Sequence, residues 1–311
     1  MSSNHSHVHS HSHSSNKKVL LVSLLILSLF MVLEVIGGIK TKSLALISDA
    51  GHMLSDSASL LIALLALNFG RRKPSESHTY GFKRFEILAA TLNGVTLLLV
   101  AGYIVYEAVG RLVDPPRVEA SGMLYIAIGG LLVNLLVAYI MVRGSDVKQN
   151  LNMRGAYQHV LSDLLGSLAA VAAALLIMGW GWQWADPLCS LLVAVLILRS
   201  GYLITKESVH VLMEGVPKGV ELNKIRAALL GHPQVEQLHH LHVWSLSSGL
   251  NSLSVHVVVK ENKSLRELQV LRAELEAKLI QLEIEHTTVQ FEPIEHGHTD
   301  SLFCQSRALG H

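Results

Sequence analysis

Four side chains that can bind a metal ion occur as two copies of one motif, each inside an apolar segment. The motif is a histidine followed four residues later by an aspartate, and its copies are His52–Asp56 and His159–Asp163. Because an α-helix turns once every 3.6 residues, the two side chains of a copy lie on one helix face, one turn apart. Two such helices facing each other would present two imidazoles and two carboxylates to one centre. That shell suits a dication of the size of zinc.

The surroundings of these residues favour an ion pathway over simple packing. Ionisable side chains are costly within a bilayer, and they mark ion paths or proton relays there. A single His–Asp pair is equally compatible with structural hydrogen bonding, whereas two copies at the same spacing favour metal binding. Asp49 lies three residues before His52 on the same helix face. We expect it to be an accessory carboxylate at the entrance to the site or around its ligands.

The elements that must position these residues are membrane-spanning helices. The chain has 311 residues, of which 50% are hydrophobic and only 16% are charged, and its mean hydropathy is +0.40. A bilayer core requires roughly 20 apolar residues for each helix. The sequence predicts six spans, at Val19–Ile39, Leu44–Phe69, Phe85–Tyr106, Ala120–Val142, Gly155–Trp180 and Pro187–Ile204.

The distribution of lysine and arginine predicts the orientation of these spans. With six spans, both termini lie on the same side of the membrane, and the segments on that side hold eleven of these residues against four in the opposite loops. Since cytoplasmic loops carry the excess of positive charge, we expect both termini in the cytoplasm. Trp180, Trp182 and Trp184 then form an aromatic belt at the outer interface.

Residues on either side of the spans differ from them in composition. Residues 1–16 form a tail rich in histidine and serine that we expect to be disordered, and residues 297–311 are expected to form a second tail. The spans occupy residues 17–206, and residues 207–296 predict a small cytoplasmic α+β domain. It begins with a predicted helix at 220–230, which two strands follow, at Val235–Leu246 and Leu250–Lys260. A second helix begins with the capping box Ser264–Glu267, and a last strand covers Ile284–Glu292.

Several motifs in this chain resemble the cation diffusion facilitator family, most closely its bacterial zinc and cadmium exporter branch. They are SLALISDAGHMLSDSASLL, HTYGFKRFEILAA, LNMRGAYQHVLSDLLGS and HHLHVWSL, which occur in this order. The resemblance spans roughly residues 17–295. It implies a homodimer of six-span protomers in the inner membrane, each with a cytoplasmic domain of metallochaperone-like (ferredoxin-like) fold. It also implies proton-coupled efflux of zinc, and of cadmium and related metals, which gives metal homeostasis and resistance.

The resemblance also assigns site residues. It places the transported ion, Zn²⁺, at His52, Asp56, His159 and Asp163. It places a structural or regulatory zinc at the dimer interface of the cytoplasmic domain. The ligands of that second ion are His239, His256 and Glu292. His240, His242 and His286 are further candidates, and His286 shares strand parity with Glu292. Gln290 stands where some members have a ligand histidine. In the loop after the second span His78 is an accessory candidate, but Ser75 and Phe82 replace its expected partners.

Other function classes have less support. The chain has no phosphate-binding loop, so no ATP or nucleotide is expected, and its net charge of +1 gives no indication of nucleic-acid binding. Protons compete with zinc for imidazoles and carboxylates, which predicts proton exchange as the driving force. A membrane metalloenzyme would need an open coordination position and a general base, and the chain has no H-E-x-x-H motif. A zinc sensor would leave the four membrane residues unexplained. The histidines at alternate positions from His5 to His13 either gather metal or are dispensable.

Overall fold

The computed structural model describes residues 10–54, 57, 74–144, 151–247, 249–294 and 302 of the chain. For residues 10–20, 144, 151–159 and 162 it describes the backbone alone. The chain divides into two compact units. One comprises Met1–Leu64 with Leu92–Thr205, and the other comprises Leu65–Thr91 with Lys206–His311.

Long apolar helices account for most of the first unit. They are α1 (Ser10–Thr41), α3 (Phe85–Val113), α4 (Ala120–Gly144), α5 (Leu151–Trp180) and α6 (Ala185–Leu212). Two of them, α3 and α6, continue into the second unit. Each of these five described helices is long and apolar enough to cross a bilayer. A further apolar helix is described over Leu44–Leu54, and the rest of the predicted second span lies outside the described residues except for Ser57.

All five helices extend beyond the predicted spans, α3 as far as Val113, and the longest extensions are those of α1 and α6. α1 begins at Ser10 rather than near Lys17, so part of the segment expected to be disordered is helical. α6 continues past Lys206 to Leu212. Both extensions have the same physical reason, because no glycine or proline lies between Ser10 and Ile36, or between Tyr202 and Leu212, to end the helix.

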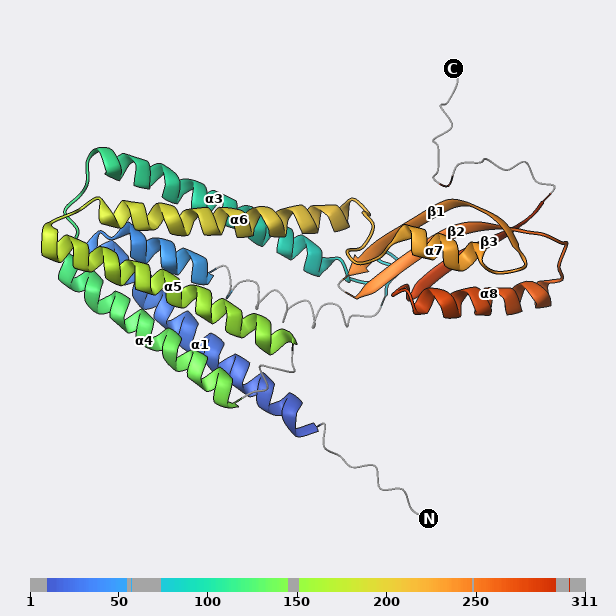
Figure 1. Ribbon diagram of the computed structural model, residues 1–311, viewed down its shortest axis with the longest axis horizontal. Coiled ribbons are helices and arrows are strands. Elements are labelled where there is room, and N and C mark those ends of the chain that lie inside the picture. The colour runs from blue at the N-terminus through green and yellow to red at the C-terminus, as the bar shows by residue number, and fades with distance from the viewer. Residues whose placement is uncertain are drawn as a thin grey trace, which may run out of the picture. The chain divides into compact units, whose positions relative to one another are not determined.

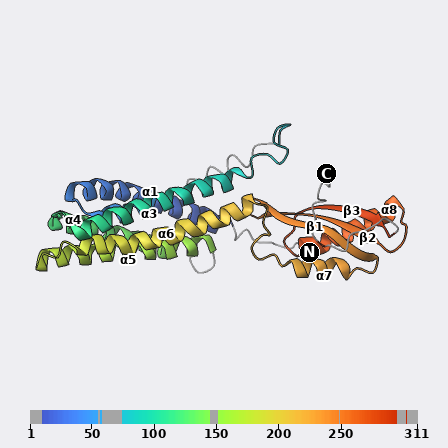
Figure 2. The ribbon, with the colours of Figure 1, turned by 90° about the horizontal axis from the view of Figure 1, so that it is seen from above.

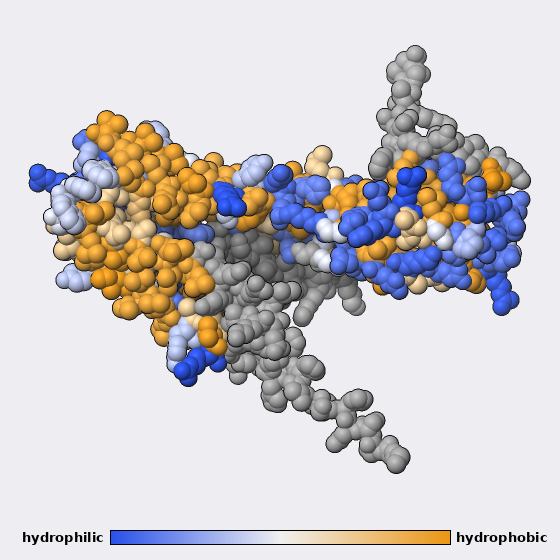
Figure 3. Space-filling view, in the orientation of Figure 1, coloured by the Kyte–Doolittle hydropathy of each residue, from blue (hydrophilic) through white to orange (hydrophobic). Residues whose placement is uncertain are grey.

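The surface of the helical unit is apolar. Leu25 is 73% exposed and Tyr106 is 77% exposed, and many other large apolar side chains on these helices are also uncovered. Figure 3 shows apolar side chains over α3, α4, α5 and α6, whereas hydrophilic side chains predominate over the strands and α8. A surface of this kind requires a lipid environment. The expected combination of membrane-spanning helices with a small α+β domain is confirmed.

The Leu44–Leu54 helix packs against α3 and α6 on one side and against α4 and α5 on another. Leu44 belongs to a buried cluster with Ile104 of α3 and Ile197 of α6. The next two residues belong to a second cluster, with Met123 of α4 and Ala173 of α5. The long helices of the unit run alongside one another in both views (Figures 1 and 2). The motif His52-x-x-x-Asp56 therefore begins on a helix that is held from both sides.

The second unit contains the predicted α+β domain. Its elements are α7 (Leu222–Leu230), β1 (Val235–Ser247), β2 (Leu250–Val259), α8 (Leu265–Ile280) and β3 (His286–Pro293), in the predicted order. The capping box is confirmed, since the Ser264 hydroxyl accepts from the Glu267 backbone N–H and the Glu267 carboxylate accepts from the Ser264 N–H. The strands form one sheet of order β1-β2-β3, with β1 and β2 antiparallel and β2 and β3 parallel.

Alternation along the strands gives the sheet two different faces. Val255 and Val257 of β2 point into the core formed with Leu229 of α7 and Leu275 of α8. His256 lies between those two valines and therefore points to the opposite face. The C-terminal tail is described at one residue, Leu302, which packs on the core and accepts a hydrogen bond from Leu241 N at 3.0 Å. We expected a tail without contacts to the domain, and Leu302 differs from that expectation. The physical reason is that the outer edge of β1 has backbone donors that need a partner.

Candidate metal sites

The helix carrying His52 lies directly against α5 in the membrane unit. Asp49, one turn before His52, is 2% exposed, and its Oδ2 accepts a hydrogen bond from Ser167 Oγ at 3.3 Å. A β-carbon placed on Gly166 would lie 2.5 Å from Asp49 Oδ1, so only glycine allows this approach. The two helices that carry the His-x-x-x-Asp motifs therefore meet at Asp49, Gly166 and Ser167.

The structure places some of the four predicted transport ligands near this junction. Asp163 lies one turn before Ser167 on α5 and is 2% exposed, and its charge interacts with that of Asp49. His52 is half-buried on the Leu44–Leu54 helix. The backbone of His159 lies in α5, one turn before Asp163, but its side chain is not described. Asp56 lies outside the described residues.

Polar side chains near the junction were given no site role on sequence grounds. Asn134 of α4 donates from Nδ2 to Ser167 Oγ at 3.2 Å and so continues the line of hydrogen bonds from Asp49. Glu34 of α1 is fully buried, and neither of its carboxylate oxygens has a hydrogen-bond partner among the described residues. A β-carbon on Gly130 would lie 3.2 Å from its Oε1. The sequence shows only that these residues are polar and lie inside apolar spans. Polar residues in spans commonly form hydrogen bonds between helices, so this feature alone does not indicate a functional site.

A second set of metal-binding side chains lies on the face of the sheet away from α7 and α8. His239 and His256 are directly opposite each other on β1 and β2. The Glu292 carboxylate of β3 reaches both imidazoles: Oε2 lies 3.0 Å from His239 Nε2, and Oε1 lies 2.8 Å from His256 Nδ1. All three residues predicted for the cytoplasmic site therefore meet at one point.

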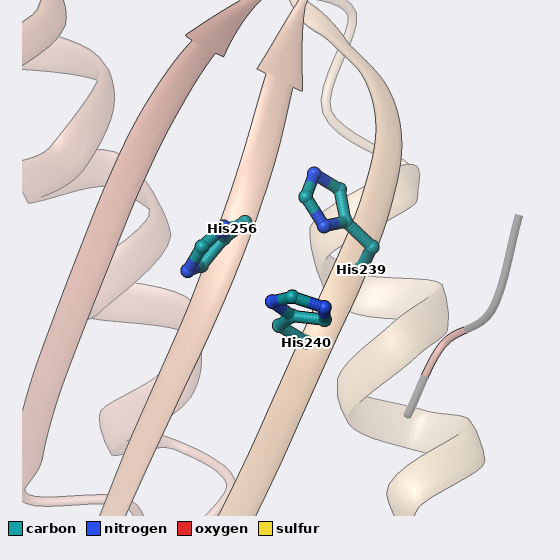
Figure 4. A group of neighbouring side chains, drawn as sticks. All are labelled: His239, His240 and His256. Atoms are coloured by element: carbon teal, nitrogen blue, oxygen red, sulfur yellow. The ribbon is translucent and has the colours of Figure 1, made fainter. Parts of the chain in front are cut away.

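A β-bulge adds a third histidine to this point. His240 has a φ of 49°, and the register between β1 and β2 shifts between His239 and His242. Successive residues of a regular strand point to opposite faces, so the bulge is what turns His240 toward its neighbours. Its ring centroid lies 5.1 Å from that of His239 and 4.9 Å from that of His256 (Figure 4).

The charges of this cluster favour the forms that bind metal. Burial lowers the pKa of His239 below its usual value, and the neighbouring His256 and His240 lower it further, against the opposing effect of Glu292. Burial alone would raise the pKa of Glu292, but its interactions with His239 and His256 outweigh that effect and hold the pKa below its ordinary range. A neutral His239 imidazole and an ionised Glu292 carboxylate are the forms that coordinate a metal ion.

The donor geometry fits zinc. The ligand atoms of His239, His240 and His256 lie within 4.8 Å of one another. Donors at zinc–nitrogen distances of about 2.1 Å are separated by about 3.4 Å in a tetrahedron. The three imidazoles are thus close to the spacing of zinc ligands, and the Glu292 carboxylate contacts two of them.

The accessory candidates His286 and His78 are not part of this cluster. His286 is exposed, four residues before Gln290 on β3, and its ring contacts Tyr80 edge-on. Gln290 donates from Nε2 to Glu292 Oε1 at 2.8 Å, so it orients that carboxylate. The Nδ1 of His78 lies 3.0 Å from Ser77 Oγ, and its ring stacks on Phe82. Within the described part of the chain, His78 has no metal-binding group around it.

Comparisons with known proteins cover nearly the whole chain. The family model for the cation efflux transmembrane domain matches residues 20–213, and that for the cytoplasmic domain of cation efflux proteins matches residues 217–294. The chain is 50% identical over 293 residues to a cadmium, cobalt and zinc/H⁺-K⁺ antiporter of Bacillus subtilis, with 94% of each chain covered. It is 41% identical to the metal cation efflux system protein CzcD of Cupriavidus metallidurans, over 94% of this chain and 93% of that protein. It is 45% identical to the zinc transporter ZitB of Yersinia pestis, over 89% and 88%. The resemblance seen in the sequence is thus confirmed, and this multi-pass membrane protein belongs to the cation efflux family of metal exporters.

Proposed function

We propose that this protein exports zinc from the cytoplasm in exchange for protons and that it also accepts cadmium. His52, Asp56, His159 and Asp163 are the proposed ligands of the transported ion. The relatives named above support the choice of metals, since their names include zinc, cadmium and cobalt. In the proposed arrangement both termini lie on the cytoplasmic side of the plasma membrane.

One observation carries the proposal for the transport site. The hydrogen bond between Asp49 and Ser167, and the close approach at Gly166, hold the His52 helix against the helix of Asp163. His52 follows Asp49 by one turn, and Asp163 precedes Ser167 by one turn. Ligands from two helices can converge on one ion only where those helices touch. Asp49 then supports the site from beside its ligands.

The chemistry of these ligands couples zinc to protons. An imidazole must be neutral and a carboxylate ionised to bind metal, so zinc and protons exclude each other at the same side chains. A site open to the cytoplasm takes up zinc and releases protons; the same site, open to the outside, takes up protons and releases zinc. The driving force is the proton gradient. The Bacillus subtilis relative is named as an antiporter of H⁺ and K⁺, which supports cation exchange.

The sheet domain is proposed to bind a resident zinc and to hold two protomers together. His239, His256 and Glu292 supply the ligands, and His240 completes the set. A zinc bound only to the folded domain stabilises it by mass action. The match to the cytoplasmic domain of cation efflux proteins supports the homodimer. We propose no catalytic reaction, because four protein ligands leave no open position for a substrate on the transported ion.

The decisive experiment measures zinc flux into proteoliposomes that contain a zinc dye and a pH dye. Asp163→Ala should abolish zinc flux and its associated proton flux, because the site loses one of its four ligands. The matched control is Asp114→Ala, which removes an exposed carboxylate in the loop before α4 and should leave the flux unchanged. Wild-type flux from a folded, dimeric Asp163→Ala protein would refute the proposed site.

A zinc sensor is the alternative function, and a second experiment, on the zinc response of cells, tests it. A sensor would rely on the sheet domain and would respond to zinc without moving it. In that case Asp163→Ala would leave the zinc response of cells intact, whereas His256→Ala would abolish it. The opposite pattern supports transport.

A further inference from the structure

A buried carboxylate holds the first turn of the helix that carries His52. Asp186, in the first turn of α6, is fully buried. Its Oδ1 accepts from Ser43 Oγ at 2.6 Å and from Ala45 N at 3.1 Å, and its Oδ2 accepts from Leu44 N at 2.8 Å. Ser43 Oγ in turn accepts from Leu46 N at 3.3 Å. The backbone donors that a helix start leaves unpaired are thus satisfied, two of them by a side chain that is distant in sequence.

Arg111 of α3 completes this arrangement. Its guanidinium donates to the carbonyl of Lys42 at 2.6 Å, in the turn before the helix, where Lys42 has a φ of 59°. The same guanidinium lies 3.9 Å from Asp186 Oδ2 and donates to Glu107 Oε1 at 2.9 Å. Groups from α3 and α6 therefore fix the turn and the first residues of the helix together.

These hydrogen bonds restrict the position of the helix in addition to stabilising its first turn. Three donors of one helix end converge on a single carboxylate, so the helix cannot rotate about its axis or slide without breaking at least one of these hydrogen bonds. Leu44 and His52 are eight residues apart, which is about 12 Å along a helix. A rotation at the first turn is carried along this rigid helix to the imidazole, and metal sites tolerate displacements of only about 0.5 Å.

We propose that Asp186 is a positioning residue for metal transport, which fixes the rotation of the Leu44–Leu54 helix and thereby the place of His52 relative to Asp163. Its side chain contacts Ser43, Leu44, Ala45 and Arg111, and among the described side chains it contacts neither His52 nor Asp163. Its effect should therefore appear in affinity and in discrimination between metals. This inference rests on the proposed transport site, and the test below separates the two.

The test compares zinc and cadmium flux in proteoliposomes for Asp186→Ala and for Asp186→Asn. Asp186→Asn keeps the volume and one acceptor oxygen. The matched control is Ser190→Ala, one turn further along α6, because Ser190 is buried and donates only to the backbone carbonyl of Asp186. In Asp186→Ala the KM for zinc should rise about tenfold, and the zinc-to-cadmium ratio of Vmax/KM should fall about fivefold or more. Asp186→Asn should shift both quantities in the same direction by less, and Ser190→Ala should change neither.

A further variant tests whether Asp186 positions the helix or only caps its first turn. In Asp186→Ala combined with Ser43→Asp, the new aspartate caps the helix from within its own segment and should recover thermal stability. The metal ratio should stay altered, because the link to α6 is still missing. Recovery of both stability and ratio would reduce Asp186 to a capping residue and overturn the inference. Wild-type KM and ratio in folded Asp186→Asn would also overturn it, whether or not Asp186→Ala folds. Loss of all flux in Asp163→Ala remains the separate criterion for the transport site itself.

Discussion

The carboxylate of Asp49 rests on the backbone of Gly166, where a β-carbon would lie only 2.5 Å from Oδ1. This contact joins the helix that carries the first His-x-x-x-Asp motif to the helix that carries the second. Both oxygens of Asp49 take part in the junction, since Oδ2 accepts from Ser167. The position of the Asp49 carboxylate in this junction therefore depends on the absence of a side chain at Gly166.

Gly166→Ala should displace the Asp49 carboxylate from this junction. Overpacking in a close contact destabilises a protein by about 1–3 kcal/mol, and the displaced Asp49 should carry His52 with it. We expect zinc flux to fall about tenfold or more. The control is Gly179→Ala on the same helix, because nothing lies within 4 Å of the β-carbon it would add. Flux of Gly166→Ala equal to that of Gly179→Ala would show that the junction does not set the geometry of the site.

His52→Asp should change the selectivity of transport. The variant replaces an imidazole nitrogen by carboxylate oxygens, and zinc prefers small tetrahedral sites with nitrogen ligands. Cadmium is larger and accepts longer, more oxygen-rich coordination. The variant should keep zinc flux and raise the cadmium-to-zinc flux ratio several-fold in proteoliposomes. An unchanged ratio would assign selectivity to side chains other than His52.

Two substitutions of His240 should distinguish the cost of its backbone conformation from the contribution of its imidazole to zinc binding. A left-handed conformation costs a residue with a β-carbon about 1–2 kcal/mol, so His240→Gly should stabilise the metal-free sheet by about 1 kcal/mol. His240→Ala should not stabilise it, but both variants should bind zinc about tenfold more weakly. Competition with a zinc-chelating dye measures this affinity, in an Asp163→Ala background that removes the proposed transport site.

The comparison for these two variants is His242→Ala, on the same strand but exposed. It should bind zinc as the parent protein does. If His240→Ala binds zinc as tightly as His242→Ala, the third imidazole is not a ligand, and the bulge needs another explanation.

Acid should weaken the metal-free sheet domain. Because the pKa of His239 is lowered in the folded state, the unfolded chain binds more protons as pH falls through about 6.5, and the free energy of unfolding decreases. The lowered pKa of Glu292 acts in the same direction below about pH 4.5, where the unfolded carboxyl takes up its proton first. Stability is therefore greatest above both ordinary pKa values.

Urea unfolding of the full-length chain in detergent and EDTA, at pH 7.5 and pH 5.5, measures this effect. Trp244 on β1 reports on the sheet alone when the other three tryptophans are replaced by phenylalanine. The midpoint should be lower at pH 5.5, and His239→Gln should remove most of the difference. An equal difference in His239→Gln would assign the titration to another group.

The sequence predicted the order of the elements, and the physical reasons are local. Span length and hydropathy define the membrane helices, and the capping box of Ser264 and Glu267 defines the start of α8. Element ends were less well predicted. α1 and α6 run past their apolar segments because polar residues such as those after Ile204 are still helix formers, and hydropathy does not report where a helix stops.

Contacts between distant residues were the part that the sequence could not provide. His239, His256 and Glu292 were assigned through family resemblance, and the structure brings them together. His240 lies beside them only because of a bulge, and bulges depend on strand pairing rather than on residue type. The role of Asp186 was also invisible, because its partners Ser43 and Leu44 are more than 140 residues away. The transport ligands remain a prediction.

The parallel pairing of β2 with β3 has a consequence for how the protein is made. The ribosome completes β1 and β2, with all three imidazoles, before it reaches α8, and Glu292 on β3 is the last member of the cluster to be synthesised. A parallel strand needs a crossover connection to reach its partner, and α8 lies in that connection here. By then the membrane spans have already left the ribosome. A nascent or truncated chain that ends before residue 286 therefore has the three imidazoles but lacks Glu292, the carboxylate that contacts both His239 and His256.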